Sequence, residues 1–347
     1  MFINKEKNPH GGDIYSRRTD IDFSSNINAA GMPERVKDAI ISSAENCDVY
    51  PDPYCTELRW AISEFENVPR DTILCGNGAA EMIYSFAYSL PKEKPALIIS
   101  PTFSEYETAL GAAGIRVMHY ALRQSDGFRL TDGVLNVDLN NFSAVFICSP
   151  NNPTGIAVDP TLVAAIAKTG VRLFLDLCFL DLTDEPERYG IPDLIKNNPN
   201  VVVLRAFTKN FATAGLRVGY VICSDAAFLD KMSEKAPCWN VSTVAQRAGV
   251  AAAGCGDWLK ESVKTIASER ERMKKELRAL GITVYDGEAN YLLLFSEKNL
   301  YELLLERGIL VRDCSNYIGL EKGYVRIAIR KRSDNDRLLK AIKEVMK

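Results

Sequence analysis

The central part of the chain alternates short apolar segments with helical patterns, and this alternation constrains its fold more than any other feature. The apolar segments are rich in β-branched residues and lie at residues 72–75, 96–99, 144–148, 171–176 and 201–204. Non-alternating strands of this kind are typical of a parallel sheet that helices cover on both faces. We therefore predict an α/β fold with one large domain over residues 46–239.

The last third of the chain has the pattern of a small α+β domain, residues 240–347. Between residues 259 and 280 apolar positions recur at intervals of four and three, interrupted only by Arg270, and Gly281 follows as a stop signal. Residues 1–45 have too little apolar content to fold alone, so we expect an N-terminal arm that completes the small domain. Its other predicted elements are strands at 291–295, 309–311 and 324–329, a helix ending at Gly308 and a final helix N-capped by Ser333.

Charge and hydropathy exclude several classes of protein. The 347 residues include 42 basic and 45 acidic ones, and the net charge of −3 provides no field for nucleic acid or anionic lipid. Apolar runs such as 144–148 fall far short of the roughly 20 residues that a membrane-spanning helix needs. We expect neither a nucleic-acid partner nor a membrane partner.

Cysteine and histidine usage narrow the chemistry further. The nine cysteines are scattered without a C-x-x-C pair, and the charged N-terminus lacks the apolar core of a secretory signal. A reduced, cytoplasmic protein is therefore expected. His10 and His119 are the two histidines, which is little material for a metal site or a Ser-His-Asp triad. We expect no metal.

Two residues at the ends of predicted strands are candidates for catalysis. Lys209 follows the 201–204 strand in an apolar loop, where a lysine can have a depressed pKa and form a Schiff base. Asp176 ends the 171–176 strand, where a carboxylate costs desolvation unless it meets a cation such as a protonated pyridine. Taken alone, Lys209 also fits a surface loop, and Asp176 a loop cap.

Two loops that follow predicted strands are candidates for cofactor binding. The loop 149–155 has the sequence SPNNPTG, and its Asn152 could donate to a ring oxygen. The segment 76–81, GNGAAE, has small residues that let backbone N–H groups approach a phosphate. Each loop alone also fits an ordinary tight turn.

In this order the segments resemble the fold-type I pyridoxal-phosphate (PLP) enzymes, the aspartate aminotransferase superfamily. The matching motifs are GNGAAE, PTFSEY at 101–106, SPNNPTG, LDLCF at 175–179, the pair Thr208-Lys209 and GLRVGY at 215–220. The resemblance covers nearly the whole chain. It implies a large PLP domain with a mostly parallel sheet sandwiched by helices, and a small α+β domain from the N- and C-terminal segments.

The resemblance also implies roles for individual residues. Lys209 would carry the cofactor as a Schiff base, and Asp176 would pair with the pyridine nitrogen. Asn152 would contact the ring oxygen, and Phe103 would stack on the ring. The cofactor phosphate would be bound by Arg217, Thr208, the amides of Gly78 and Ala79, and Tyr50 of the neighbouring subunit, which implies a homodimer. Ala206 stands where relatives often have a hydroxyl that helps to hold this phosphate.

Further segments are similar to the threonine-phosphate decarboxylase family of cobalamin biosynthesis. They are His10-Gly11-Gly12, DFSSNIN at 22–28, ILVR at 309–312 and YVRIAIR at 324–330. This similarity implies PLP-dependent decarboxylation of O-phospho-L-threonine to (R)-1-amino-2-propanol O-2-phosphate. Arg326 would hold the substrate carboxylate, next to Asn152, and the substrate phosphate would be bound by His10, Gly11, Asn26 and Arg312.

Other interpretations stay open at this point. An aminotransferase acting on histidinol phosphate or a similar amino acid shares the core motifs, although it usually lacks HGG and DFSxNIN. A PLP-binding regulatory protein would need a basic DNA-binding module, for which the chain has no room.

Leu177-Cys178 replaces the usual Glu-Ala after Asp176. Threonine and serine phosphates differ by one methyl group, and no residue identifies the pocket for it.

Overall fold

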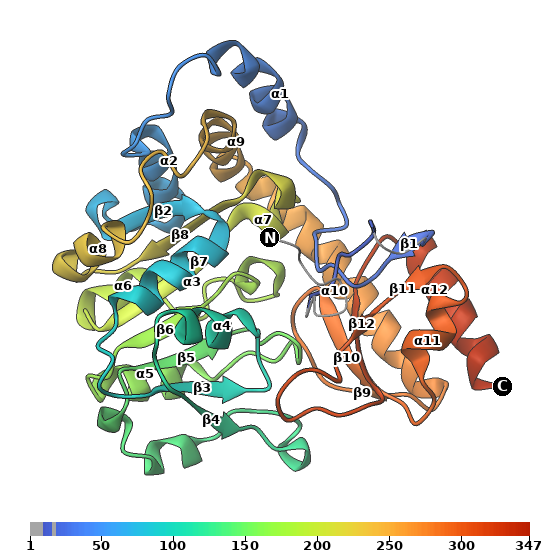
Figure 1. Ribbon diagram of the computed structural model, residues 1–347. Coiled ribbons are helices and arrows are strands. Elements are labelled where there is room, and N and C mark those ends of the chain that lie inside the picture. Colours follow the sequence, from blue (N-terminus) through green and yellow to red (C-terminus); the bar gives the residue numbers. More distant parts are fainter. Residues whose placement is uncertain (1–9, 16–18) are drawn as a thin grey trace.

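The computed structural model describes residues 10–15 and 19–347, and its larger part is built on a seven-stranded sheet (Figure 1). The strand order is β2-β8-β7-β6-β5-β3-β4, and β8 is antiparallel to both of its neighbours while the other pairs are parallel. The strands are β2 (Ile73–Asn77), β3 (Ala96–Ser100), β4 (Val117–Ala121), β5 (Ala144–Cys148), β6 (Leu173–Asp176), β7 (Val201–Ala206) and β8 (Val218–Ile222).

Side chains alternate between the two faces of this sheet, and helices cover both. Phe146 and Phe174 pack on the face that is covered by α3 (Gly78–Ser89), α4 (Glu105–Ala112) and α8 (Ala226–Ser233). Ile147 and Leu175 pack on the opposite face, against helices that include α5 (Pro160–Lys168) and α6 (Ile191–Asn197). The predicted α/β class, with a mostly parallel sheet between helices, is confirmed.

All five predicted strands form, and the sheet contains two that the sequence pattern did not reveal. β4 is an edge strand whose residues are mostly half-buried or exposed, so it lacks a continuous apolar run. β8 lies within the GLRVGY motif, whose glycines and arginine mask a fully buried strand.

The smaller part of the fold combines the two ends of the chain. Its antiparallel sheet has the order β12-β13-β10-β9, and β1 near the N-terminus pairs in parallel with β11 near the C-terminus. The strands are β1 (Ile21–Asp22), β9 (Thr283–Val284), β10 (Tyr291–Phe295), β11 (Ile309–Leu310), β12 (Arg312–Asp313) and β13 (Tyr324–Ala328). The domain boundaries at residues 46 and 239 stay a prediction.

The remaining helices pack around these two sheets. The helix predicted at 259–280 is α10, and its one interrupting residue, Arg270, is buried and donates to the Glu288 carbonyl and to Asp184. Within the described residues no helix is long and apolar enough to cross a membrane. The helices are α1 (Glu34–Ser43), α2 (Thr56–Glu66), α7 (Phe207–Asn210), α9 (Thr243–Ala253), α10 (Gly256–Ala279), α11 (Leu300–Leu305) and α12 (Arg332–Met346).

The predicted N-cap of the last helix is wrong. α12 begins at Arg332 with Lys331 as its N-cap, so Ser333 already lies inside the first turn. The buried amide of Asn335 accepts from the Arg330 N–H and donates to the Arg330 carbonyl. This amide ties the helix start to Arg330, which follows β13, and the N–H groups of Asp334 and Asn335 donate to the Lys331 carbonyl.

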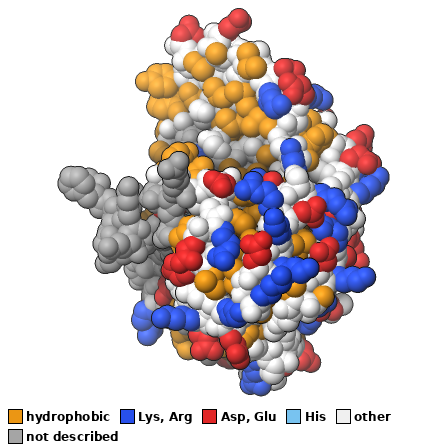
Figure 2. All heavy atoms as spheres, turned by 90° about the vertical axis from the view of Figure 1, so that its right-hand side faces the viewer, with side chains coloured by type: hydrophobic (Ala, Val, Ile, Leu, Met, Phe, Trp, Pro, Cys, Tyr) orange, Lys and Arg blue, Asp and Glu red, His pale blue; other side chains and the backbone are white. Residues whose placement is uncertain are grey.

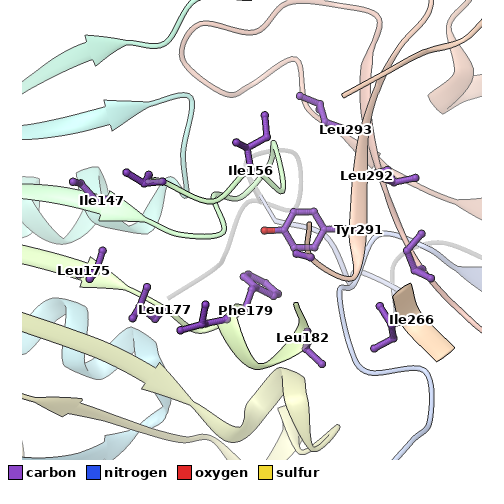
Figure 3. Close-up of a cluster of buried hydrophobic side chains, with 14 of the residues drawn as sticks. Ile147, Ile156, Leu175, Leu177, Phe179, Leu182, Ile266, Tyr291, Leu292 and Leu293 are labelled. Atoms are coloured by element: carbon purple, nitrogen blue, oxygen red, sulfur yellow. The ribbon is translucent and has the colours of Figure 1, made fainter. Parts of the chain in front are cut away.

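A hydrophobic cluster joins the large sheet to the smaller part (Figure 3). Phe179, which follows β6, meets the ring of Tyr291 on β10 edge-on, with the centroids 4.9 Å apart. Ile266 of α10 and Leu182 lie in the same cluster. This packing fixes the smaller part against the ends of the parallel strands, where polar side chains gather.

Candidate active site

A cavity of about 390 Å³ opens at the carboxyl ends of the parallel strands, between the large sheet and the smaller part. Asn152, Asp176 and Lys209 follow the adjacent strands β5, β6 and β7, so the sheet brings them to one edge. Except for Gly78 and Tyr50, every residue predicted for the site lines this cavity. These residues are His10, Gly11, Asn26, Ala79, Phe103, Asn152, Asp176, Thr208, Lys209, Arg217, Arg312 and Arg326.

Asp176 is buried at the end of β6 and is held by two donors. The Tyr106 hydroxyl donates to Oδ2 at 2.5 Å, and the Cys178 N–H donates to Oδ1 at 2.9 Å. Burial raises the pKa of Asp176, although both hydrogen bonds oppose the shift. A cation placed against this carboxylate would restore the charge that burial disfavours.

Lys209 lies in the short helix α7, directly after β7. Burial and the nearby Arg326 guanidinium lower the pKa of Lys209 to about 8, so its amine loses a proton far more readily than an exposed lysine. Its backbone is also fixed, because the Asn28 N–H donates to the Lys209 carbonyl at 3.0 Å. The Asn28 side chain donates in turn to the Asn210 carbonyl and to Ser262 of α10.

A buried ionic network supports the same turn from below. Arg205 of β7 donates to Glu66 at 2.8 Å and to Asp181 at 2.6 Å. Asp181 also accepts from the side chain of Asn210 at 2.7 Å, and Glu66 accepts from the Tyr220 hydroxyl. Arg205 precedes Lys209 and Asn210 follows it, so the network fixes the chain on both sides of the lysine. Each buried charge in the network is paired, as its stability requires.

The start of α3 lies directly against Arg217, which the resemblance assigns to the cofactor phosphate. Gly78 has a φ of +81°, and a Cβ at this position would lie 2.7 Å from the Arg217 guanidinium. Only glycine therefore allows the approach. Gly78, which was predicted to bind the phosphate, does not line the cavity. The cavity wall beside Arg217 is formed by Ala79, Ala80 and Thr208.

Two arginines of the smaller part also line the cavity. Arg326 on β13 donates to the Asn152 side-chain oxygen and, at 2.6 Å, to the Ser24 carbonyl. Arg312 on β12 donates to Asn316 at 2.7 Å and lies over the ring of Tyr317. Both arginines are less than a tenth exposed, so both hold positive charge out of bulk water.

Two residues of this cavity have unpartnered polar atoms. Among the described residues, the buried polar atoms without a hydrogen-bond partner are the amides of Asn26 and Asn290 and Nε of Arg59 and Arg326. An unpaired buried polar group is costly, and of these residues Asn26 and Arg326 line the cavity. Their neighbours are cationic, so the ligand that fits here is an anion.

Tyr50 lies apart from the cavity. Its ring is 79% exposed and stacks on Trp239, with the centroids 4.7 Å apart. It belongs to a surface groove that also includes Asp52, Glu57 and Arg247. Within this one chain Tyr50 does not reach the predicted phosphate site.

Two tyrosines of the site were not predicted from the sequence. Tyr106 lies in the PTFSEY motif, and its hydroxyl holds Asp176. Tyr317 lines the cavity, and its hydroxyl donates to Asn152 at 3.2 Å. Tyr106 lies in the first turn of α4, and its ring meets that of Phe103, just before the helix, edge-on with the centroids 5.7 Å apart. Tyr317 has no comparable local signal.

Comparison with known families agrees with this geometry. The family described as aminotransferase class I and II matches residues 18–342. The chain belongs to this family. It is a PLP-dependent enzyme, and the predicted membership of the fold-type I superfamily is confirmed.

Similar members of the family include proteins of two activities. A threonine-phosphate decarboxylase from Salmonella typhimurium is 38% identical, over 97% of this chain and 96% of the relative. The structure of a histidinol-phosphate aminotransferase from Clostridium acetobutylicum has a TM-score of 0.88 at 30% identity, with 94% of this chain and 99% of that chain covered. A histidinol-phosphate aminotransferase from Sinorhizobium meliloti in complex with pyridoxal-5'-phosphate has a TM-score of 0.81 at 21% identity, covering 100% and 95%.

The cavity residues fit this cofactor. The buried Asp176 carboxylate needs a cationic partner, and Lys209 has an amine with a lowered pKa in the same cavity. Arg217 and the backbone at the start of α3 suit a phosphate group. The cavity therefore has a predicted cofactor end around Asp176 and Lys209, and a cationic end around Arg312 and Arg326 that is the predicted substrate end.

Proposed function

We propose that this enzyme releases CO2 from O-phospho-L-threonine and forms (R)-1-amino-2-propanol O-2-phosphate, as a step of cobalamin biosynthesis. The observation that carries the proposal is the pair of buried arginines at one end of the cavity. The substrate has two anionic groups, a carboxylate and a phosphate, and each needs a fixed cation. The decarboxylase that is 38% identical over 97% of this chain supports the same choice.

In this proposal Arg326 binds the substrate carboxylate. Its guanidinium is held by Asn152 and by the Ser24 carbonyl, and it lies near Lys209. The phosphate then occupies the region lined by His10, Gly11, Asn26 and Arg312. The unpartnered Asn26 amide would donate to a phosphate oxygen.

When bound, pyridoxal phosphate supplies an electron sink that is conjugated with the substrate nitrogen. Lys209 would hold the cofactor, Asp176 would lie at its ring nitrogen, and Phe103 would stack on the ring. Asn152 uses its side-chain oxygen for Tyr317 and Arg326, so its NH2 group would donate to the ring oxygen. Thr208, Arg217 and the Ala79 amide would bind its phosphate, beside Gly78.

Substrate orientation selects the bond that breaks. Arg326 would hold the carboxylate and so determine which bond at Cα is aligned for cleavage, and the bound cofactor would supply the electron sink for that bond. CO2 leaves, and one proton must be added at Cα to balance the reaction. Lys209 donates this proton, since its pKa of about 8 lets the amine gain and lose one near neutrality.

We further propose that the active form is a homodimer. Hydrophobic side chains gather on the upper part of the molecule, where α1 lies (Figure 2). Large apolar side chains that are exposed in this single chain include Ile41, Val49, Tyr50, Tyr54 and Trp239. Burial of such a surface against a second copy would bring Tyr50 towards the partner's cofactor phosphate.

The second candidate function is transamination of histidinol phosphate or a similar amino acid. The TM-score of 0.88 to a histidinol-phosphate aminotransferase favours it. Histidinol phosphate has a phosphate but no carboxylate, so it would leave one of the two arginines without an anion.

Product analysis separates the two functions. Purified holoenzyme is incubated in parallel with O-phospho-L-threonine, O-phospho-L-serine and histidinol phosphate, with and without 2-oxoglutarate. The proposal expects CO2 and the amino alcohol phosphate from phosphothreonine, with no need for 2-oxoglutarate. A keto acid and pyridoxamine phosphate as the products from phosphothreonine would contradict it.

A further inference from the structure

His10 is held by the large domain through Glu105. Nε2 of His10 lies 2.8 Å from Oε1 of Glu105, which is the first residue of α4. The imidazole also packs on Phe103, with the ring centroids 5.6 Å apart. The Glu105 side chain is 18% exposed and that of His10 is 35% exposed, so the pair is partly shielded from water.

The backbone next to His10 is fixed from the opposite side. The Gly12 N–H donates to the Ser24 hydroxyl at 2.7 Å, and a Cβ on Gly11 would lie 2.5 Å from the Ser24 carbonyl oxygen. Ser24 is two residues from Asn26, and its carbonyl accepts from Arg326. The arm is therefore anchored by its backbone to the substrate end of the cavity and by its imidazole to α4.

We propose that Glu105 is a positioning residue for the substrate phosphate and acts through His10. This inference rests on the proposed function, which assigns His10 to the phosphate. With Nε2 bonded to Glu105, the imidazole plane is fixed at the cavity wall. Glu105 is not among the cavity-lining residues, so its carboxylate does not face the anion.

The chain contains a matched pair that serves as a control. His119 of β4 lies 3.8 Å from Glu107, which is also on α4, and its Nδ1 bonds the Ser100 hydroxyl at 2.8 Å. Neither His119 nor Glu107 lines the cavity. A substitution at Glu107 therefore removes the same charge from the same helix without touching the arm.

The test measures how tightly the holoenzyme binds a phosphorylated amine and its unphosphorylated counterpart. The ligands are (R)-1-amino-2-propanol O-2-phosphate and (R)-1-amino-2-propanol, titrated against the absorbance of the bound cofactor. For Glu105→Ala we expect about tenfold weaker binding of the phosphate ester and unchanged binding of the other amine. Glu105→Gln, whose carbonyl can still accept from the imidazole, should recover part of the loss, and Glu107→Ala should match the parent.

A double-mutant cycle with His10→Ala decides whether Glu105 acts through His10. If it does, Glu105→Ala adds no further loss in the His10→Ala background. Additive losses, or equal weakening of both amines, would overturn the inference. A parent enzyme that does not prefer the phosphate ester would refute the proposed function itself. A parent that prefers it, with Glu105→Ala unchanged, would refute only the role of Glu105.

Discussion

The two ends of the cavity differ in how far their buried polar atoms are paired. The carboxylate oxygens of Asp176 accept hydrogen bonds, whereas buried atoms of Arg326 and Asn26 have no partner. Both Asp176 oxygens have donors, from Tyr106 and Cys178. In the described part of the chain, Nε of Arg326 and the whole amide of Asn26 have none. Under the proposed function the cofactor end is therefore preorganised, and the substrate end would be completed by the anion that it binds.

The two ends also differ in how the chain builds them. Asp176 and Lys209 follow neighbouring strands of one sheet, and each is fixed by local contacts. Asn26 and Arg326 come from opposite ends of the chain and meet only when the smaller part forms. It follows that substitutions at one end should leave the other end measurable, and four predictions use this separation.

The largest effect is expected from Lys209→Ala. Without the amine the protein cannot tether the aldehyde, so the absorbance of the covalently held cofactor should disappear and turnover should fall at least about 1,000-fold. Absorbance spectra and CO2 release measure the two losses. Lys235→Ala, at an exposed position, is the control. Parental turnover by Lys209→Ala would refute the entire assignment of the site.

Arg326→Gln should act mainly on substrate binding. Loss of the cation should lower kcat/KM for O-phospho-L-threonine by about 100-fold, equivalent to about 2.7 kcal/mol. The absorbance of the covalently held cofactor should persist with a changed pH dependence, because Arg326 also holds Asn152 and helps to lower the pKa of Lys209. Arg332→Gln, at an exposed position on α12, controls for loss of a charge. If the cofactor spectrum is also lost, the two ends are not separable.

The lowered pKa of Lys209 predicts how fast apoprotein takes up the cofactor at different pH values. Below pH 8 the amine is mostly protonated and cannot attack, so the rate should rise about tenfold per pH unit and level off above about 8. The growth of absorbance after mixing with pyridoxal phosphate gives this rate. An N-blocked lysine amide gives the reference for an ordinary amine. A rate that still rises steeply at pH 9.5 would contradict the burial of this amine.

Ala206→Ser should give the smallest effect and sharpens the description of the cofactor end. Ala206 is buried at the end of β7, just before Thr208 and Lys209. A hydroxyl there could add one hydrogen bond to the cofactor phosphate, so we expect about threefold slower cofactor dissociation. Dialysis against a cofactor scavenger measures it, with Ala253→Ser on α9 as the control. Faster dissociation would place the phosphate elsewhere.

The sequence predicted that Asp176 and Lys209 lie close together, because the signals for both residues are local. A buried strand followed at once by Asp176 or Lys209 needs only the parallel sheet to bring the two together. β4 and β8 escaped prediction because burial at a sheet edge, or inside a glycine-rich motif, leaves no apolar run. Fold class and superfamily could therefore be predicted without the exact strand count.

The substrate end was predicted by resemblance, and its detail could not be. Tyr317 reaches Asn152 across a long stretch of chain, and no spacing in the sequence reports such a contact. Glu105 and His10 meet in the same way. Contacts of this kind depend on how the smaller part sits on the large sheet, which is a property of the packed fold.

One short segment, residues 26–28, serves both ends at once. Asn26 lines the substrate end, while Asn28 bonds the carbonyls of Lys209 and Asn210 and the Ser262 hydroxyl of α10. If an incoming substrate displaced residues 26–28, the hydrogen bond from Asn28 to the Lys209 carbonyl would move with them, and so would the Lys209 backbone. This link constrains the evolution of a new substrate specificity, because a substitution at Asn26 that changes the substrate end would also shift the Lys209 amine.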